Sequence, residues 1–467
     1  MKKKLLIYAH YYIPDTASTG QIIAELAEGL LDQFEVTVIC VVPSYDGVIK
    51  DKYKSEKFYH ENINGVNVIR VRVPEFTKSN KISRIKNILA YFFGSLYATR
   101  KVGKQDYVLT VSQPPILGGL LGVYGKWRLK RAVGRKRQEA KSKNPLYYNK
   151  NKVETFGKEG FQEESEASVS RNPERAKYIY QIQDFNPEQI EAVSYFKCKT
   201  LIWLLRKLDK FSCHQADLVI TVGRDLKETI EKRFEKHPEK MPKISLINNW
   251  IDEKEIYPLE ENHPQVERFK RKYGLTNKFI IAYSGNLGHY YDLLELLKVV
   301  KHFKPGTKSA DGRVVAFIFI GEGSLLEKMK EYVADNHMDN VSFIPYQPKK
   351  DLIYSLNAVD VHWCVNAKGI KGVSCPSKYY GIAAAGKPVL GVLEEGTEIR
   401  CIIEETEGGL CCEPGDYKSV IANVTWFIEN AGSELMMSMG IRSREYLVEN
   451  LTKENSVKKY AEVILRL

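Results

Sequence analysis

The feature that most constrains the fold is an alternation of short β-branched runs with amphipathic helical patterns, which stops once and then restarts. The runs of the first series are 4–9, 35–42, 66–72, 107–111, 178–183, 218–222 and 243–247. A polar stretch at 253–265 follows, and then runs at 279–284, 314–320, 341–344, 359–363 and 388–392. Such alternation is typical of parallel sheets covered by helices. The sequence therefore predicts an α/β protein with two Rossmann-like, doubly wound domains, 1–258 and 259–467, facing across a cleft, and the last helix could pack back on the first domain.

Length and composition agree with more than one globular domain. A chain of 467 residues exceeds the size at which one hydrophobic core keeps growing, and 43% of its residues are hydrophobic. The beginning of the chain lacks the pattern of a secretory signal, and no run reaches the roughly 18 apolar residues of a membrane span. The eight cysteines show no Cys-x-x-Cys spacing. We therefore expect a cytoplasmic protein.

The net charge and the absence of several sequence motifs limit which partners and cofactors can be expected. The net charge of +12 favours anionic partners, including nucleotides and phospholipid surfaces. The chain has no His-x-x-x-His pair, no Asp-x-Asp triplet, no Gly-x-Gly-x-x-Gly fingerprint and no Walker A loop. No basic and aromatic pattern of a nucleic-acid module is present. We therefore expect neither a metal nor another cofactor, and no nucleic-acid partner.

Several predicted strands end in loops that contain glycine. Glycine lets backbone N–H groups approach a phosphate closely, and a following helix adds its positive amino-terminal end. The alternative is that each glycine only makes a tight turn. The loop residues singled out for binding are Thr19 and Gly20 in the first domain, and Gly285, Asn286, Leu287, Gly288, Gly321 and Glu322 in the second.

A charged segment at about 130–175 interrupts the first domain. A basic block at 126–152 is followed by an acidic one at 153–166. Blocks of like charge with few apolar residues do not offset the entropy lost on ordering. We interpret the segment as a flexible insertion between two strands; a solvated loop without a specific partner is the alternative to a binding role.

A series of short motifs occurs in a specific order along the chain. They are YYIP (11–14), TG (19–20), PSY (43–45), QDFNPE (183–188), ADLVI (216–220), NNWID (248–252), SGNLG (284–288), CPSKYY (375–380) and AGKPV (385–389). In this order and spacing, the chain resembles the retaining glycosyltransferases of family 4, which have the two-domain GT-B fold, and especially their bacterial polysaccharide-biosynthesis branch.

The chemistry of glycosyl transfer gives these positions roles. Negative charge grows on the diphosphate leaving group, so a cation and N–H groups aimed at it stabilise the transition state. Lys378, beside Pro376 and Ser377, is the candidate cation, or else a surface lysine. Asp184 ends a predicted strand and could orient the acceptor or steady positive charge on the sugar; its alternative role is a helix cap. Glu398 could bind sugar hydroxyls or be a first-turn charge.

The chain departs from the family pattern around the donor. Members often carry an Arg and a Lys in the loop that is 285–292 here, where this chain offers Asn286 and Tyr291. The two family glutamates map onto Val373 and Gly381. The resemblance therefore implies that the ribose and diphosphate contacts are replaced or rearranged in this chain.

Residues 81–101 predict an amphipathic helix, for which burial in the core is the favoured interpretation and contact with an anionic membrane, at the inner face of the cell membrane, is the alternative. Apolar residues recur there at helical spacing beside basic ones, a pattern that suits either a bilayer surface or a buried core helix. The apolar positions are Ile82, Ile85, Leu89, Phe92, Phe93 and Leu96, and the basic ones are Lys81, Arg84, Lys86, Arg100 and Lys101.

Taken together, the resemblance implies a retaining, metal-independent glycosyltransferase. It would use a nucleotide-sugar donor, with UDP as the first expectation, and a glycan or polyprenyl-linked acceptor in cell-surface polysaccharide assembly. Two alternatives keep the fold: a sugar-nucleotide epimerase, and a noncatalytic scaffold that binds a nucleotide-sugar or glycan.

Overall fold

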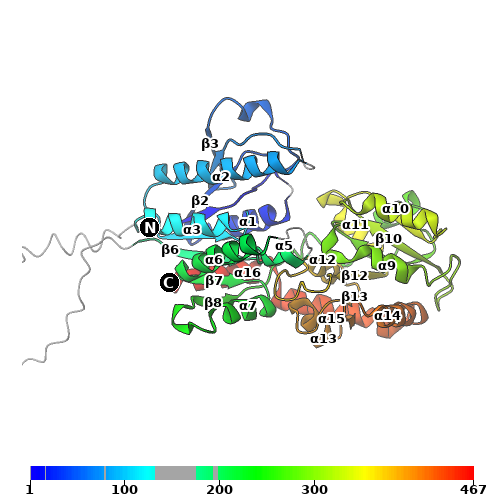
Figure 1. The fold of residues 1–467 in the computed structure, drawn as a ribbon. Helices are drawn as coiled ribbons and strands as arrows, with labels where there is room; N and C mark the ends of the chain where they lie inside the picture. The colour runs from blue at the N-terminus through cyan, green and yellow to red at the C-terminus, as the bar shows by residue number, and fades with distance from the viewer. Residues whose placement is uncertain (1, 16, 78–79, 132–174, 193–197) are drawn as a thin grey trace, which may run out of the picture.

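The computed structural model describes residues 2–15, 17–77, 80–131, 175–192 and 198–467. Two sheets, each with helices on both faces, lie side by side in this part of the chain (Figure 1). The first has the order β3-β4-β2-β1-β5-β6-β7-β8 and the second β11-β10-β9-β12-β13-β14. All paired strands are parallel except β3, which runs antiparallel to β4. This arrangement confirms the predicted α/β class.

The first sheet is formed by residues of the amino-terminal half. Its strands are β1 (Lys3–Tyr8), β2 (Phe34–Val41), β3 (Phe58–Ile63), β4 (Val66–Val71), β5 (Tyr107–Val111), β6 (Lys177–Ile182), β7 (Leu218–Thr221) and β8 (Lys243–Leu246). Its helices are α1 (Ser18–Gly29), α2 (Lys81–Lys101), α3 (Leu117–Arg128), α5 (Glu188–Ala192), α6 (Lys199–Gln215) and α7 (Arg224–Phe234), with short 3₁₀ turns η1 (Asp51–Tyr53) and η3 (Pro238–Lys240).

The second sheet is formed by residues of the carboxyl-terminal half. Its strands are β9 (Lys278–Ser284), β10 (Val314–Ile320), β11 (Val341–Ile344), β12 (Val361–Val365), β13 (Val389–Val392) and β14 (Gly409–Cys412). The helices are α8 (Pro264–Lys272), α9 (Leu293–Val300), α10 (Leu326–Asp335), α11 (Leu352–Asn357), α12 (Lys378–Ala384), α13 (Glu398–Glu405), α14 (Tyr417–Glu429), α15 (Glu434–Asn450) and α16 (Lys453–Leu465), with 3₁₀ turns η4 (His289–Tyr291) and η5 (Lys349–Asp351).

The strand sequences explain why both faces of each sheet are covered. Every residue of β5 is buried, as are the last six of β10. A continuous apolar run of this kind cannot leave one face in water. Glycines in α3 let that helix lie close to the sheet: a Cβ at Gly122 would come 2.0 Å from the ring of Tyr178.

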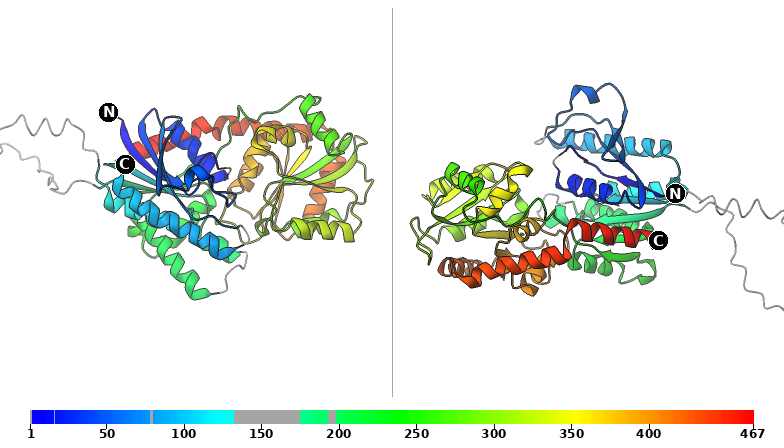
Figure 2. Two further views of the ribbon diagram at one scale, coloured as in Figure 1. Left: turned by 90° about the horizontal axis from the view of Figure 1, so that it is seen from above. Right: turned by 180° about the vertical axis from the view of Figure 1, so that it is seen from behind.

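The chain returns to the first sheet at its end. In α16, the side chains of Val457, Tyr460 and Ile464 belong to the same buried cluster as Leu5 and Ile7 of β1. Figure 2 shows this helix beside the amino-terminal sheet, although it follows the second sheet in sequence. The last helix therefore ties the two halves together.

The predicted strands all occur, with ends shifted by up to two residues, and two further strands are present. The sequence pattern missed β3 and β14. Most of the predicted insertion at about 130–175 lies outside the described residues; at its ends, Lys130 and Arg175 form an antiparallel bridge. None of the helices in the described ranges combines the length and apolar character that a bilayer crossing requires.

The apolar stripe of α2 is largely exposed. The exposed fractions of Ile82, Ile85 and Phe93 are 68%, 54% and 63%, and Leu89 is also exposed. Only Phe92 and Leu96 pack against the buried cluster on that face. The core interpretation of the stripe is therefore wrong for its exposed members, because the residues that bury α2 lie on its other side, among them Tyr91 and Ala98.

Candidate active site

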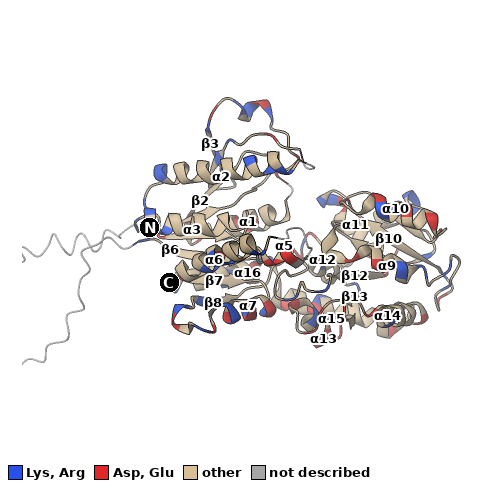
Figure 3. Ribbon diagram, viewed as in Figure 1, with Lys and Arg blue, Asp and Glu red and all other residues tan. Residues whose placement is uncertain are grey.

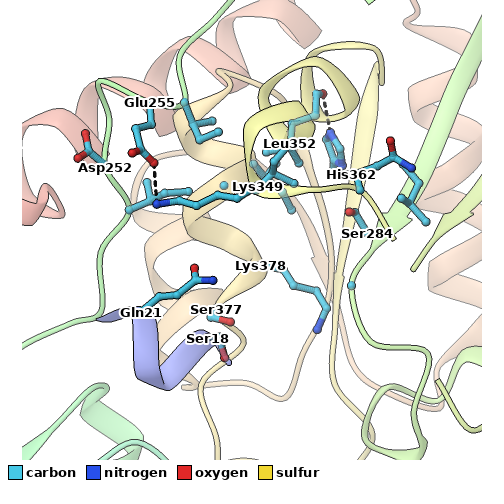
Figure 4. A pocket seen from close by; sticks show the side chains of 18 of the residues that line it. Ser18, Gln21, Asp252, Glu255, Ser284, Lys349, Leu352, His362, Ser377 and Lys378 are labelled. Carbon is cyan, nitrogen blue, oxygen red and sulfur yellow. Dashed lines mark hydrogen bonds and ion pairs between the residues drawn. The ribbon is translucent and has the colours of Figure 1, made fainter. Parts of the chain in front are cut away.

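A cavity of about 330 Å³ lies between the two halves, where strands of the second sheet end. From α1 it is lined by residues including Ser18 and Gln21, and from the second half by Ser284, Gly285 and Lys378 among others. Figure 4 shows Lys378 reaching from α12 into this space, with Ser18 and Gln21 nearby on α1. Ligands of open α/β sheets bind at the carboxyl ends of the strands, and this cavity has that position.

Two cations line this cavity, Lys349 and Lys378, and Lys349 is paired with Glu255. Lys378 is different. Its ammonium lies 3.6 Å from the ring centroid of Tyr291 and 5.2 Å from that of Tyr283. Within the described ranges, its contacts are these rings, and no carboxylate is paired with it. A positive charge in a cleft without a paired acid attracts an anionic ligand.

The two glycine loops of the second half pack tightly on each other. A Cβ at Gly321 would lie 2.0 Å from the carbonyl oxygen of Gly285, so neither loop has room for a side chain there. The N–H groups of Gly285 and Leu287 donate to the carbonyls of Ile320 and Glu322 at 2.9 Å. Those two N–H groups are therefore already used, which corrects the expectation that they receive a phosphate.

A second cavity, of about 240 Å³, lies on the amino-terminal half. Its lining includes His10, Arg84, Gln113 and Asn186. Arg84 is exposed, and no carboxylate in the described part of the chain is paired with it. The Nε2 atom of His10 is buried without a described hydrogen-bond partner, and burial lowers the pKa of His10 to about 4. This cavity therefore offers a cation and a neutral imidazole.

Asp184 follows β6 and lies where the two halves touch. Its carboxylate accepts hydrogen bonds from the Ser374 hydroxyl and, at 3.5 Å, from Gln113 Nε2. Gln113 also lines the second cavity. Burial raises the pKa of Asp184, and the two hydrogen bonds oppose that rise. The carboxylate bonds these side chains rather than the first N–H groups of α5, so its described contacts are not those of a helix cap.

The structure brings together some of the residues predicted from sequence and separates others. Gly285, Ser377 and Lys378 line the first cavity. Thr19 and Gly20 line a small recess with His10, Tyr11 and Gln113, and the Thr19 hydroxyl donates to Gln183 Oε1 at 3.2 Å. Besides Asp184 and Glu398, the predicted residues that line neither this recess nor the first cavity are Asn286, Leu287, Gly288, Gly321, Glu322 and Pro376, and the Leu287 side chain belongs to the core.

Glu398 has a structural role instead of the predicted donor contact. Its carboxylate is buried and accepts from the backbone N–H and Nε of Arg224, at 2.7 and 2.9 Å, and from Asn248 Nδ2 at 2.8 Å. Both partners belong to the amino-terminal half. The prediction of sugar binding by Glu398 is therefore corrected: both oxygens of this first residue of α13 are used to join the halves.

Several lining residues of the first cavity were not found from sequence. Trp250 Nε1 donates to Glu25 at 2.8 Å, and Lys349 pairs with Glu255 at 2.8 Å and with Glu25 at 3.7 Å. Trp250 lies within the NNWID motif, which could have indicated it. Glu25 and Lys349 are ordinary charged residues in the sequence, and only the meeting of α1 with η5 reveals them.

Comparisons with known proteins find similarity to glycosyltransferases. Residues 265–446 match the model of the family described as glycosyl transferases group 1. A probable glycosyltransferase, WbjE of Pseudomonas aeruginosa, is 28% identical over 290 residues, 62% of this chain and 68% of its own length. The putative colanic acid biosynthesis glycosyl transferase WcaI of Escherichia coli (strain K12) is 22% identical over 291 residues, 61% of this chain and 67% of its own.

Solved structures share the fold at low identity. Sucrose-phosphate synthase from Thermosynechococcus elongatus aligns with a TM-score of 0.68 and 12% identity over 100% of this chain and 99% of its own. HepE from Anabaena, in complex with UDP and glucose, gives a TM-score of 0.62 and 11% identity over the whole of both chains. These likenesses confirm the GT-B fold, and the sequence relatives confirm the resemblance to bacterial polysaccharide glycosyltransferases.

Proposed function

We propose, from the match of residues 265–446 to the model of the glycosyl transferases of group 1, that the chain transfers a sugar from a nucleotide-sugar to a lipid-linked glycan acceptor in cell-surface polysaccharide assembly. The donor occupies the cavity beside Lys378. The acceptor occupies the cavity beside Arg84, and Asp184 lies on the path between them. The reaction retains the anomeric configuration and needs no metal, as the family resemblance implies.

The unpaired Lys378 supports the donor assignment. Breaking the anomeric bond leaves a nucleoside diphosphate with growing negative charge, and a fixed ammonium stabilises that charge most strongly in the transition state. Among the described residues, Lys378 contacts two aromatic rings, and no carboxylate compensates its charge. HepE was solved with UDP and glucose, which supports UDP as the first nucleotide to test.

The second cavity supports an acceptor that carries a negative group. Arg84 offers a guanidinium suited to phosphate, and His10 and Asn186 offer polar atoms for sugar hydroxyls. Asp184 reaches this cavity through Gln113. A carboxylate in that position can orient the acceptor hydroxyl or steady positive charge on the transferred sugar.

The exposed face of α2 supports contact with an anionic membrane. Its 21 residues contain no acidic side chain. Figure 3 shows basic residues at both ends of α2 and an uncharged middle. The exposed apolar residues include Leu89 and Phe93 in that middle and Ile85 between Arg84 and Lys86. Apolar side chains flanked by cations are the pattern of a helix that lies in the headgroup region. The same helix supplies Arg84 to the acceptor cavity, so an acceptor anchored in lipid would arrive beside it.

The observation that carries the proposal is that Lys378, in a cavity shared by both halves, has no acidic partner among the residues that the structure describes. A thermal-shift screen tests it, because a ligand that binds the folded chain raises its melting temperature. We expect one nucleoside diphosphate among UDP, GDP, ADP and dTDP to stabilise the protein selectively in EDTA. No shift with any of them would contradict the donor assignment. A shift that appears only with added magnesium or manganese would contradict metal independence.

Analysis of the reaction products distinguishes a glycosyltransferase from the two alternatives, a scaffold and an epimerase. With the donor sugar of the identified nucleotide and a diphosphate-linked lipid acceptor, we expect a new glycosidic product. Binding without product would favour the scaffold. Conversion of the nucleotide-sugar alone into its epimer would favour the epimerase.

A further inference from the structure

The side chain of Lys378 passes between a glycine and an aromatic ring. A Cβ at Gly285, whose φ is +149°, would lie 2.3 Å from Cε of Lys378, so only glycine leaves room for the lysine on that side. The ring of Tyr291 lies 3.6 Å from the ammonium. The lysine is therefore confined by its neighbours, and no ion pair with a described residue holds it.

The position of Tyr291 is fixed by its surroundings. It is the last residue of η4, and the carbonyl of the preceding Tyr290 accepts from the N–H of Ala367 at 2.7 Å. The following residue, Asp292, has φ +51° and accepts from the Tyr417 hydroxyl at 2.8 Å. Contacts on both sides thus hold the loop that carries the ring.

The two rings near Lys378 differ in kind. Tyr283 is fully buried, and its hydroxyl donates to the carbonyl of Asn286 at 2.8 Å, so it belongs to the core of the second half. Tyr291 is only half-buried and lies closer to the ammonium. Tyr291 is therefore the ring whose replacement can change Lys378 while disturbing the core least.

We propose that Tyr291 is a positioning residue that holds the Lys378 ammonium for the diphosphate of the donor. The negative face of an aromatic ring attracts a cation and restricts its side chain. Unlike a carboxylate, the ring does not neutralise the cation, so no ion pair has to break when a diphosphate arrives. This inference rests on the proposed function for the identity of the ligand.

Titration calorimetry in EDTA tests the proposal with UDP and uridine as probes. Tyr291→Leu should weaken UDP about tenfold, the scale of a partly desolvated cation–π contact, and leave uridine unchanged. Tyr291→Phe keeps the ring and should bind UDP within about twofold of the native chain. In a Lys378→Ala background, Tyr291→Leu should have no further effect, because the two residues act through one charge.

A matched variant controls for general loosening of the domain. Tyr332 of α10 is also a half-buried tyrosine packed on the core of the second half, away from the cavity. Tyr332→Leu should leave UDP affinity unchanged. Three results would overturn the positioning role while leaving the proposed function intact. Tyr291→Leu could lose affinity for UDP and uridine equally, could keep its UDP affinity, or could add its effect to that of Lys378→Ala. Failure of the native chain to bind UDP or any other nucleoside diphosphate would overturn both.

Discussion

At Asp184, burial disfavours the ionised carboxylate, which is the form that the proposed reaction uses. Burial raises its pKa, so the ionised form is held at a cost, and only the Ser374 hydroxyl and Gln113 amide offset part of it. In the described part of the chain no cation is paired with this half-buried carboxylate, which is uncommon unless a site uses the charge. Asp184 is therefore the residue whose charge we expect the reaction to need.

We predict that Asp184→Asn lowers kcat by roughly tenfold or more while donor affinity stays within about twofold. The amide keeps the shape and can accept from Ser374, and rotation of the Gln113 amide restores the second hydrogen bond. Steady-state kinetics and UDP titration measure the two effects. Native turnover in this variant would remove Asp184 from the mechanism.

The raised pKa of Asp184 also predicts a pH dependence. Activity should fall as the pH drops through this raised pKa, and that acid limb should be absent from the residual activity of Asp184→Asn. For stability the sign is opposite: the native carboxyl stabilises the fold when protonated, and this contribution is lost as pH rises through the folded pKa. The variant should therefore gain stability relative to the native chain across that interval, measured by urea unfolding at several pH values.

Glu398 is a structural carboxylate, and its replacement can be compared with that of Asp184. Glu398→Gln removes the buried charge that faces Arg224, and we expect the free energy of unfolding to fall by about 2 kcal/mol, with UDP affinity unchanged. Chemical denaturation and calorimetry measure the two quantities. Reduced UDP affinity at native stability would restore the role that the sequence suggested.

At the scale of elements, α2 shows an unpartnered apolar face among basic residues. Ile85→Ser with Phe93→Ser should abolish binding to vesicles that contain phosphatidylglycerol, because the exposed side chains are the ones expected to enter the bilayer. Flotation of vesicles measures this.

Helix α15 supplies the control for that experiment. Leu435 and Ile441 are exposed to a similar extent, at 54% and 56%, but α15 contains acidic as well as basic residues. Leu435→Ser with Ile441→Ser should leave vesicle binding intact. Equal loss of vesicle binding in both double variants would mean that nonspecific hydrophobic adsorption, rather than the exposed face of α2, binds the vesicles.

The fold could be predicted from sequence where strands are buried on both faces. The run 314–320 is continuously apolar, the run 107–111 is interrupted only by Thr110, and they coincide with strands β10 and β5. Strand β3 was missed because it is an antiparallel edge strand with polar residues such as His60 and Glu61. Strand β14 has only four residues and begins with glycine, so it carries little pattern of its own.

At the scale of the whole molecule, the site depends on contacts that no sequence pattern encodes. Asp225 accepts from the backbone N–H groups of Gly372 and Glu398, at 2.8 and 3.3 Å, and so joins α7 to the second half. Glu25 meets Trp250 and Lys349 from distant parts of the chain. Motifs indicated Lys378 and Asp184, whereas His10, Arg84 and Glu25 became candidates only through the fold.

The central claim is that a nucleoside diphosphate binds beside Lys378 without a metal. The measurement that tests it most directly is calorimetric titration in EDTA of the native chain, Lys378→Ala and Lys368→Ala, using the nucleotide identified by thermal shift. Lys368 is an exposed lysine that does not line the cavity. We predict at least about a tenfold loss of affinity in Lys378→Ala, the scale of a lost charged contact, and native affinity in Lys368→Ala. Equal affinity in all three proteins, or no binding without a divalent ion, would contradict the account.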